Sequence, residues 1–280
     1  MAQILIQGTL LSGLYALIAI GFTMIFGVGR VLNLAHAGYV MVAGYSYFWA
    51  TYMMGLPVGA GFAIAIAISS GLAVGTYMGW VRRFLDDPTV VFVSTLIMAL
   101  LLGHIMTLAF FRENINVPPV VEGMTQFMGY SFSKNLIAGV IVSWICIAIV
   151  LLFVRRTHMG RAMRALAMDR RGAIISGINP DRVNLITWAI SGALAGVAGI
   201  FYGSYTFLVP DMWVLPLIMS FAIVVIGGLG SIEGTLAGAH IVGFMETVTV
   251  LAISDKLRSV PGLVIMIIVL VLRPKGLFGR

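Results

Sequence analysis

The side chains that could titrate within the apolar parts of this sequence are few and widely separated. They are His36, His104, His240 and Glu246. If those parts lie in a membrane, an ionised group costs about 2.5–3.5 kcal/mol, so we expect these residues to face a bundle interior. His240 and Glu246 are six residues apart, which turns them to different faces of one helix and argues against a proton relay. His104 is predicted to be structural. For Glu246, a structural hydrogen bond to a neighbouring helix and a role in transport are both open.

The motifs of the commonest hydrolytic sites are absent. The sequence has no Gly-x-x-x-x-Gly-Lys-Ser/Thr loop, no His-Glu-x-x-His and no Gly-x-Ser-x-Gly. The only cysteine, Cys146, lies in an apolar run, which excludes a disulfide framework. We therefore predict that the chain is not an enzyme and has no catalytic residues, no metal site, no cofactor and no nucleotide-binding motif of its own.

Polar residues gather at one interruption of the apolar pattern. Asn33 and His36 stand between the first two apolar runs, beside Tyr39. In one interpretation they line a substrate path. In the other, which the general rule for buried polar groups favours, they bond to backbone groups that a broken helix leaves free.

The densest charge lies in residues 155–184, which hold seven of the 17 Lys and Arg residues. On a helical wheel Arg161, Arg164 and Arg171 share one face. The opposite face is apolar apart from Arg170. Its apolar residues are Met159, Met163, Leu166, Ala173 and Ile174. Gly177 suits the position after a helix, and Asn179-Pro180-Asp181 is typical of an N-cap and a first turn. A basic amphipathic helix here is either a lipid-surface element or a docking surface for a partner.

The composition places these features in an integral membrane protein. Hydrophobic residues make up 60% and charged residues 10% of the chain, whereas soluble domains carry about 25% charged residues. Runs of about 20 apolar residues, enough to span a bilayer, cover 4–28, 34–54, 59–81, 89–111, 135–154, 183–209, 215–229, 235–253 and 260–272. We predict an all-α, polytopic transmembrane helical bundle of about nine spans (eight to ten), forming a single domain over residues 1–280.

Loop charge predicts the orientation, because cytoplasmic loops carry an excess of Lys and Arg. If 155–184 is cytoplasmic, 13 of the 17 basic residues fall inside, the others there being Arg30, Arg82, Arg83, Arg273, Lys275 and Arg280. The basic residues outside are Arg112, Lys134, Lys256 and Arg258. The expected layout is N-out and C-in. An outer loop, 112–134, contains Pro118-Pro119, which favours extended chain; it either meets an extracytoplasmic partner or caps the bundle.

Small residues recur at four-residue spacing. They are Gly71, Gly75 and Gly79; Gly192 and Gly196; Gly199 and Gly203; and Gly234 and Gly238. Helix backbones without a Cβ between them approach closely in lipid, so we predict tight packing there. The denser segment 227–231, Gly-Gly-Leu-Gly-Ser, is expected to break a helix where a path or gate needs exposed backbone.

Four segments together resemble a known family. They are 27–38 (Gly-Val-Gly-Arg-Val-Leu-Asn-Leu-Ala-His-Ala-Gly), 160–165 with 177–179, 227–234 (Gly-Gly-Leu-Gly-Ser-Ile-Glu-Gly) and 272–279 (Leu-Arg-Pro-Lys-Gly-Leu-Phe-Gly). In this order and spacing they are similar to permease subunits of branched-chain amino acid ABC importers, the LivH-type membrane subunit. The resemblance implies a multi-pass protein of the bacterial inner (plasma) membrane. It would form the translocation path for branched-chain amino acids or related solutes such as urea or amides, and couple it to separate ATPase subunits.

The resemblance also implies partners and site residues. The partners are a second permease subunit (a related, different chain), two ATP-binding ATPase subunits, an extracytoplasmic solute-binding protein and membrane lipid, with no nucleic acid. The basic stretch would carry the ATPase-coupling loop, with Gly160, Arg161, Arg164, Asp169, Arg170 and Gly177 as its residues, while Asn33 and His36 are candidates for the substrate path. The chain departs from the family at Arg171-Gly172, where an acidic residue and alanine are common, and Gly172 is expected to shorten the helix. The alternative function is an ion-gradient-driven secondary transporter in which Glu246 and His240 titrate.

Overall fold

The structure, a computed structural model, describes residues 2–111, 113–127 and 129–279. Arg112 and Arg280, two of the predicted loop charges, lie outside the described residues. The helices are α1 (Ala2–Gly29), α2 (His36–Phe48), α3 (Val58–Gly79), α4 (Pro88–Phe110), α5 (Lys134–Arg156), α6 (His158–Met168), α7 (Arg170–Ile175), α8 (Pro180–Tyr205), α9 (Val214–Gly227), α10 (Ile232–Ala252) and α11 (Val260–Leu272). Short π or 3₁₀ turns lie at Trp49–Met53, Val81–Arg83 and Asp255–Leu257. Strands β1 (Met124–Phe127) and β2 (Tyr130–Ser133) form an antiparallel hairpin.

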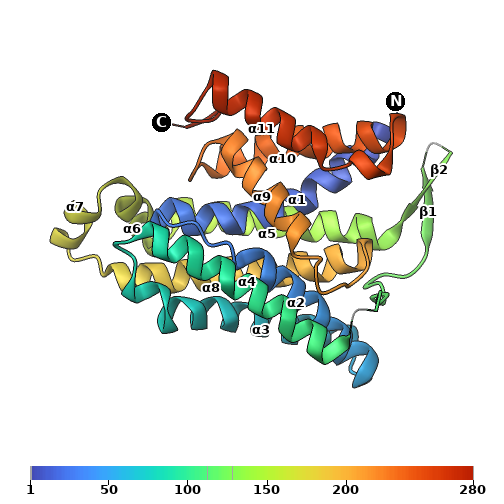
Figure 1. Ribbon diagram of the computed structural model, residues 1–280, viewed down its shortest axis with the longest axis horizontal. Helices are drawn as coiled ribbons and strands as arrows, with labels where there is room; N and C mark the ends of the chain where they lie inside the picture. The colour runs from blue at the N-terminus through green and yellow to red at the C-terminus, as the bar shows by residue number, and fades with distance from the viewer. Residues whose placement is uncertain (1, 112, 128, 280) are drawn as a thin grey trace.

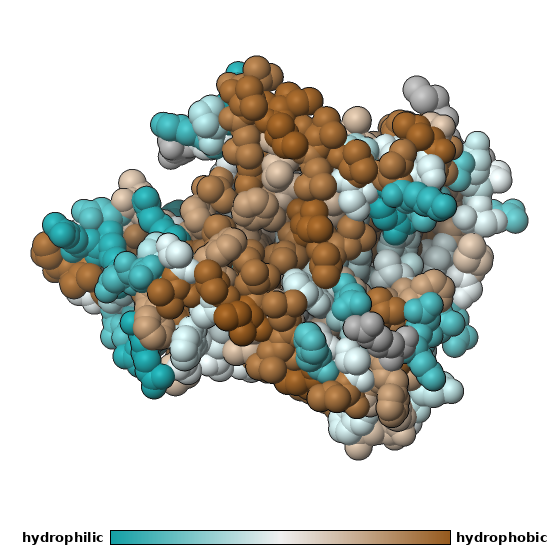
Figure 2. All heavy atoms as spheres, in the orientation of Figure 1, coloured by the Kyte–Doolittle hydropathy of each residue, from teal (hydrophilic) through white to brown (hydrophobic). Residues whose placement is uncertain are grey.

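Each predicted apolar run contains one long or half-length helix, so the all-α prediction is confirmed. In the described part of the chain, six helices are long and apolar enough to cross a membrane: α1, α3, α4, α5, α8 and α10. The other three, α2, α9 and α11, have 13 or 14 residues each, fewer than the roughly 20 that a full span needs. Hydrophobic side chains form a broad band over the middle of the visible face, and hydrophilic ones gather toward its two ends (Figure 2). This is the surface of a multi-pass membrane protein.

The basic segments around Arg82, Arg83 and 155–184, predicted to be cytoplasmic, meet at one end of the molecule. Arg82 pairs with Asp181 at 2.7 Å and Arg170 with Asp86 at 2.9 Å, so the α3–α4 turn lies beside the α7–α8 region. α6 and α7 project from this end, whereas the β1–β2 hairpin lies at the opposite end (Figure 1). We call these the basic end and the hairpin end. The charge-based grouping of the loops is thus found in the fold.

The segment between α4 and α5 is mostly extended, as its proline pair predicts, and also contains the hairpin, which the sequence reasoning did not predict. Ile115 exchanges backbone hydrogen bonds with Leu208. Asn135, at the start of α5, accepts from the backbone N–H groups of Val120 (2.8 Å) and Val121 (3.3 Å). These bonds fasten the segment across the hairpin end of the bundle.

α8 is the central helix, and its glycines let neighbouring backbones come close. A Cβ on Gly192 would lie 2.7 Å from the Ser70 Cα of α3, and one on Gly199 would overlap the Val40 carbonyl oxygen of α2. Tight packing is likewise found at Gly234 and Gly238. The prediction is wrong for one stripe. Gly71, Gly75 and Gly79 of α3 face outward, with no atom within 4 Å of an added Cβ.

The glycine-rich segment 227–231 does break the chain between α9 and α10, where Gly228 and Gly230 have φ of 103° and 84°. Its backbone is not left exposed, however. The tail after α11 lies against it, with Leu277 N–H donating to the Ile226 carbonyl at 2.8 Å and Phe278 N–H to the Gly227 carbonyl at 3.0 Å. The tail therefore binds two of the carbonyls that the end of α9 leaves without helical partners.

Candidate functional site

α6 folds back against the end of α5 because of two local features. The Thr157 hydroxyl accepts from the Gly160 N–H at 2.9 Å, which caps the first turn. Gly160 itself lies so close to the last turn of α5 that a Cβ would overlap the Phe153 and Val154 carbonyl oxygens. Gly160 is therefore a packing residue of the predicted coupling loop, and its missing side chain sets the angle between α5 and α6.

The predicted single amphipathic helix is in fact two helices, divided at Asp169. Asp169 has extended backbone, with φ −147° and ψ 107°, and its carboxylate accepts from the Arg171 N–H at 3.0 Å as the N-cap of α7. The wheel holds for α6, where Met163 and Leu166 are buried. Beyond Asp169 it holds for Ala173, which is buried, and is wrong for Ile174, which the change of direction places on the surface. Gly172 does not shorten the helix; it lies inside α7.

Both helix-end signals after α7 are confirmed. Gly177 has φ 81°, its N–H bonds to the Ile174 carbonyl, and the Ile178 N–H reaches back to the Ala173 carbonyl, which is a Schellman ending. Asn179 then caps α8 by accepting from the Arg182 N–H at 3.2 Å. The α6–α7 unit therefore has a defined shape, fixed at Gly160, Asp169 and Gly177.

The tip of the α6–α7 unit carries exposed apolar side chains that the sequence reasoning missed. Met168 is 83% exposed, Ile175 87% and Ile174 50%. At this projecting end, Figure 2 shows hydrophobic atoms among hydrophilic ones. The missing information was where the helices end: Met168 and Ile175 are the last residues of α6 and α7.

Polar contacts join the α6–α7 unit to two other parts of the bundle. Arg30, at the end of α1, donates to the Ala167 carbonyl in the last turn of α6 at 2.9 Å, and Arg170 pairs with Asp86 of the α3–α4 turn. Arg155 lies outside the unit, in the last turn of α5, and pairs with Glu233 of α10. Each exposed pair contributes about 0–1 kcal/mol. Their positions matter more, because they link the unit to α1 and the α3–α4 turn, and the adjoining α5 to α10.

The break between α1 and α2 holds Asn33 and His36, both buried. His36 lies against the middle of α1, its Nε2 donating to the Ile18 carbonyl at 3.0 Å and its Nδ1 3.2 Å from the Ser191 hydroxyl of α8. A Cβ on Gly21 would lie 2.6 Å from the ring, so the glycine makes room for it. α2 therefore begins beside the middle of α1, at a level about 16 Å before the C-terminal end of α1.

Side chains satisfy backbone groups along this break. Asn33 Oδ1 accepts from the Ala35 N–H and Thr95 Oγ1 from the Leu34 N–H, each at 3.1 Å. The buried Asn33 Nδ2 has no partner among the described residues. These contacts support the structural interpretation of Asn33 and His36. Their assignment to a substrate path stays a prediction.

Replacing His36 by alanine is expected to destabilise the protein by about 3 kcal/mol, because it removes two buried hydrogen bonds and leaves a cavity. Thermal unfolding of the purified protein, followed by size-exclusion chromatography, measures this. His104→Ala is the matched control, since His104 is exposed on α4 and bonds only to its own helix, at Leu100. Unchanged stability of the His36 variant together with lost transport would assign His36 to the path instead.

The other titratable residues are not brought together. His240 bonds to the Leu236 carbonyl and lies beside Trp144, with the two rings tilted by 50°, whereas Glu246 accepts from the Tyr15 hydroxyl of α1 at 2.7 Å. Glu246 thus makes the interhelical hydrogen bond that was one of its two open alternatives; its role in transport stays a hypothesis. The sequence predicts that His104 faces the bundle interior. This prediction is wrong, because His104 is exposed at the surface. Within the described residues, no three His, Cys, Asp or Glu side chains are placed to hold a metal.

Comparisons with known proteins agree with this architecture. A family described as "Branched-chain amino acid transport system / permease component" matches residues 4–272. The chain is 32% identical to the high-affinity branched-chain amino acid transport system permease protein LivH of Escherichia coli (strain K12), over 99% of this chain and 95% of the relative. It is 30% identical to the corresponding protein BraD of Pseudomonas aeruginosa, with the same coverage.

One solved structure shares the fold. It is a chain of PsaBC from Streptococcus pneumoniae in complex with Fab, with a TM-score of 0.51 and 13% identity, over 97% of this chain and 93% of that one. The match of the family over nearly the whole chain, together with relatives that are permease proteins by name, fixes the assignment. The chain belongs to the family of permease components of branched-chain amino acid transport systems.

Proposed function

We propose that this chain is the membrane permease subunit of an ABC importer for branched-chain amino acids or related small solutes, in the bacterial inner (plasma) membrane. Its helices would cross or enter the bilayer about nine times, with the N-terminus outside and the C-terminus in the cytoplasm. The gathering of basic segments at one end supports this orientation, because such segments stay cytoplasmic. The whole chain would act as one transmembrane domain.

The observation that carries the proposal is the α6–α7 unit, which projects from the basic end and exposes Met168 and Ile175. Such side chains in water are unfavourable, and a groove on an ATPase subunit would cover them. Residues 155–184 would then be the coupling loop. In it, Arg161 and Arg164 are exposed on α6 beside the apolar tip, where a partner's acidic groups could meet them.

The shape of the loop suits a rigid-body transmission of force. Gly160, Asp169 and Gly177 fix the unit internally, while Arg170 ties it to the α3–α4 turn. A displacement of the tip on ATP binding would therefore reach α1 through Arg30, and α10 by way of α5, whose Arg155 pairs with Glu233. Helices that move as blocks would switch access between the two sides of the membrane.

The remaining partners follow from an importer of this kind. A second, related permease subunit would complete the path, two ATP-binding subunits would dock at the basic end, and an extracytoplasmic solute-binding protein would deliver the solute. At the hairpin end, the extended segment fastened by Asn135 borders a surface hollow of about 460 Å³, flanked by Tyr52 and Pro118-Pro119. This hollow supports the hairpin end as the face for the solute-binding protein.

Reconstitution tests the function. In proteoliposomes, the chain with its partner permease and ATPase subunits is expected to take up L-leucine only when ATP and the solute-binding protein are present. The matched control contains the permease chains alone and is given a proton or sodium gradient. Uptake by that control would support the secondary transporter and contradict the proposal.

A further inference from the structure

Arg30, the residue that follows α1, has a backbone conformation that residues with a Cβ rarely adopt. Its φ is 53°, and its N–H donates to the Phe26 carbonyl at 2.8 Å. This is the left-handed ending of a helix, a position that glycine usually fills because a Cβ is unfavourable there. Gly177 fills the equivalent position after α7, with φ 81°. At the end of α1, the chain therefore has a strained arginine where a glycine would fit without strain.

The Arg30 side chain makes a contact that can offset this strain. Its Nη2 donates to the Ala167 carbonyl in the last turn of α6 at 2.9 Å, and it forms no ion pair within the described part of the chain. The last carbonyls of a helix lack helical partners, and the C-terminal end of a helix attracts a positive charge. The left-handed backbone of Arg30 thus occurs together with a guanidinium bound at the end of α6.

The hydrogen bond from Arg30 to Ala167 is suited to being broken and remade. Arg30 is exposed, so water can replace the carbonyl when α6 moves away, and the bond contributes little net stability. The strain acts in the same direction, because a residue in the left-handed region relaxes once the surrounding structure stops holding it there. Release of the side chain and relaxation of the backbone therefore favour each other.

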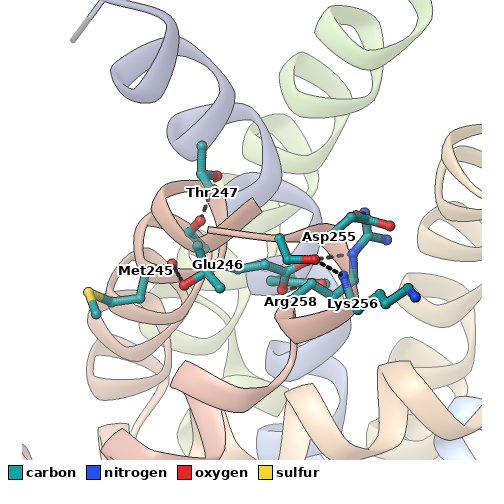
Figure 3. Close-up of polar contacts among 10 residues, drawn as sticks. Met245, Glu246, Thr247, Asp255, Lys256 and Arg258 are labelled. Carbon is teal, nitrogen blue, oxygen red and sulfur yellow. Dashed lines mark hydrogen bonds and ion pairs between the residues drawn. The ribbon is translucent and has the colours of Figure 1, made fainter. Parts of the chain in front are cut away.

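The other half of α1 is fixed to α10, which leaves Arg30 as the place where the chain can turn. Tyr15 donates to Glu246 of α10 at 2.7 Å, and Glu246 lies 3.6 Å from Arg258, just before α11 (Figure 3). A Cβ on Gly243 of α10 would lie 2.9 Å from backbone atoms of α1. Helices packed this closely move as one block.

The segment after Arg30 leads directly into the break between α1 and α2. The described residues 31–35 form no helix, and Asn33 and His36 are three and six residues beyond Arg30. Thr95 of α4 accepts from the Leu34 N–H at 3.1 Å, which fastens the far side of the segment. A change of φ and ψ at Arg30 therefore redirects this segment relative to α1, and with it the start of α2.

We propose that Arg30 is a strained hinge that couples the position of the α6–α7 unit to the α1–α2 break. While α6 lies against α1, the Ala167 carbonyl holds the guanidinium and the backbone stays left-handed. When the ATPase subunits displace the unit, the hydrogen bond breaks, Arg30 relaxes, and the segment with Asn33 and His36 changes direction. The inference rests on the proposed function and deepens it, since it names the residue that positions the break.

The number of ATP molecules hydrolysed per L-leucine taken up tests this role, measured in proteoliposomes that contain the complete importer. Arg30→Gly and Arg30→Ala both remove the guanidinium, and each is expected to raise this ratio about fivefold or more, as for a lost coupling between two sites. Arg30→Gly also removes the strain, so its importer should melt about 2–4 °C above that of Arg30→Ala. Equal loss of coupling at unequal stability is a result that a merely structural role would not give.

Two further variants serve as controls. Arg30→Lys keeps a charged donor on a long side chain and should retain most of the coupling. Arg83→Ala removes a guanidinium–carbonyl bond of the same length, 2.9 Å, at the same end of the molecule. Arg83 bonds to Gly79, four residues before it, so the ratio should equal that of the wild type. If Arg30→Ala fails to fold, Arg30→Gly and Arg30→Lys decide.

The outcomes distinguish the hinge from the function. A ratio in Arg30→Gly equal to that of the wild type, or recovered relative to Arg30→Ala in step with the melting temperature, would overturn the hinge and leave the function standing. An equal rise in Arg83→Ala would also overturn it. A wild-type importer that hydrolyses ATP without taking up any small solute would instead overturn the proposed function.

Discussion

Reversing the charge of Arg161 and Arg164 together is expected to abolish ATP-driven uptake, by about 100-fold or more, while the protein stays folded and inserted. Both side chains are exposed on α6, and neither forms an ion pair with another described residue. Within the chain, the reversal removes two exposed hydrogen bonds to carbonyls at the end of α5, from Arg164 to Val154 and from Arg161 to Arg156, which contribute about 1 kcal/mol each. Against a partner it brings like charges together, which costs several kcal/mol. Uptake, co-purification of the ATPase subunits and substrate-stimulated ATP hydrolysis measure the effect.

The control is a second double reversal at the same end. Arg83→Glu with Arg273→Glu changes the same amount of charge on exposed residues outside 155–184, and it should leave uptake nearly intact. Ile175→Asp tests the apolar tip by a different physical route, because it places a charge where a partner's groove would exclude water. If the ATPase subunits still co-purify with both loop variants and hydrolysis is unchanged, the docking assignment is wrong.

Replacing Gly199 by alanine is expected to cost about 3 kcal/mol or more and to lower the yield of folded protein sharply. The new Cβ would overlap the Val40 carbonyl oxygen and lie 2.9 Å from the Ala43 Cβ. A backbone oxygen cannot rotate away as a side chain can, so α2 and α8 would have to separate, which is the costly form of overpacking. Thermal stability and the amount of monodisperse protein after extraction measure the loss.

Gly71→Ala is the matched control on α3. It adds the same methyl group to a helix, but into open space. By helix propensity it should stabilise the protein slightly, by at most about 1 kcal/mol. Equal losses for the two variants would contradict the packing explanation of Gly199.

Much of this fold could be predicted from the sequence because membrane spans have simple rules. Apolar length located α1, α3, α4, α5, α8 and α10, and loop charge grouped the segments of the basic end. Cap signals placed the C-terminal end of α7 and the start of α8, since Gly177, Asn179 and Pro180 act within a few residues of themselves. Such local chemistry does not depend on which helix packs beside it.

One error is local. The wheel through 155–184 assumed one helix, although Asp169 caps a new one through a bond to Arg171, two residues along. The other failures arise where distant parts of the chain decide the outcome. The stripe of Gly71, Gly75 and Gly79 looks the same in sequence as the glycines of α8, and only the arrangement of helices shows that it faces outward. The Glu246–Arg258 contact joins the end of α10 to the turn before α11 and depends on Tyr15, 231 residues away from Glu246.

The contacts of α8 also have a consequence for how the chain enters the membrane. Ser69 of α3 bonds to the Gly192 carbonyl at 2.8 Å, Ser70 to the Ala189 carbonyl at 2.9 Å, and His36 to Ser191. These partners are 119 to 155 residues further along the chain. During synthesis, therefore, α2 and α3 are made before these partners in α8 exist, and unpaired polar groups are unfavourable in the lipid interior. We expect the packing of α2 and α3 to be completed only after α8 has entered the membrane.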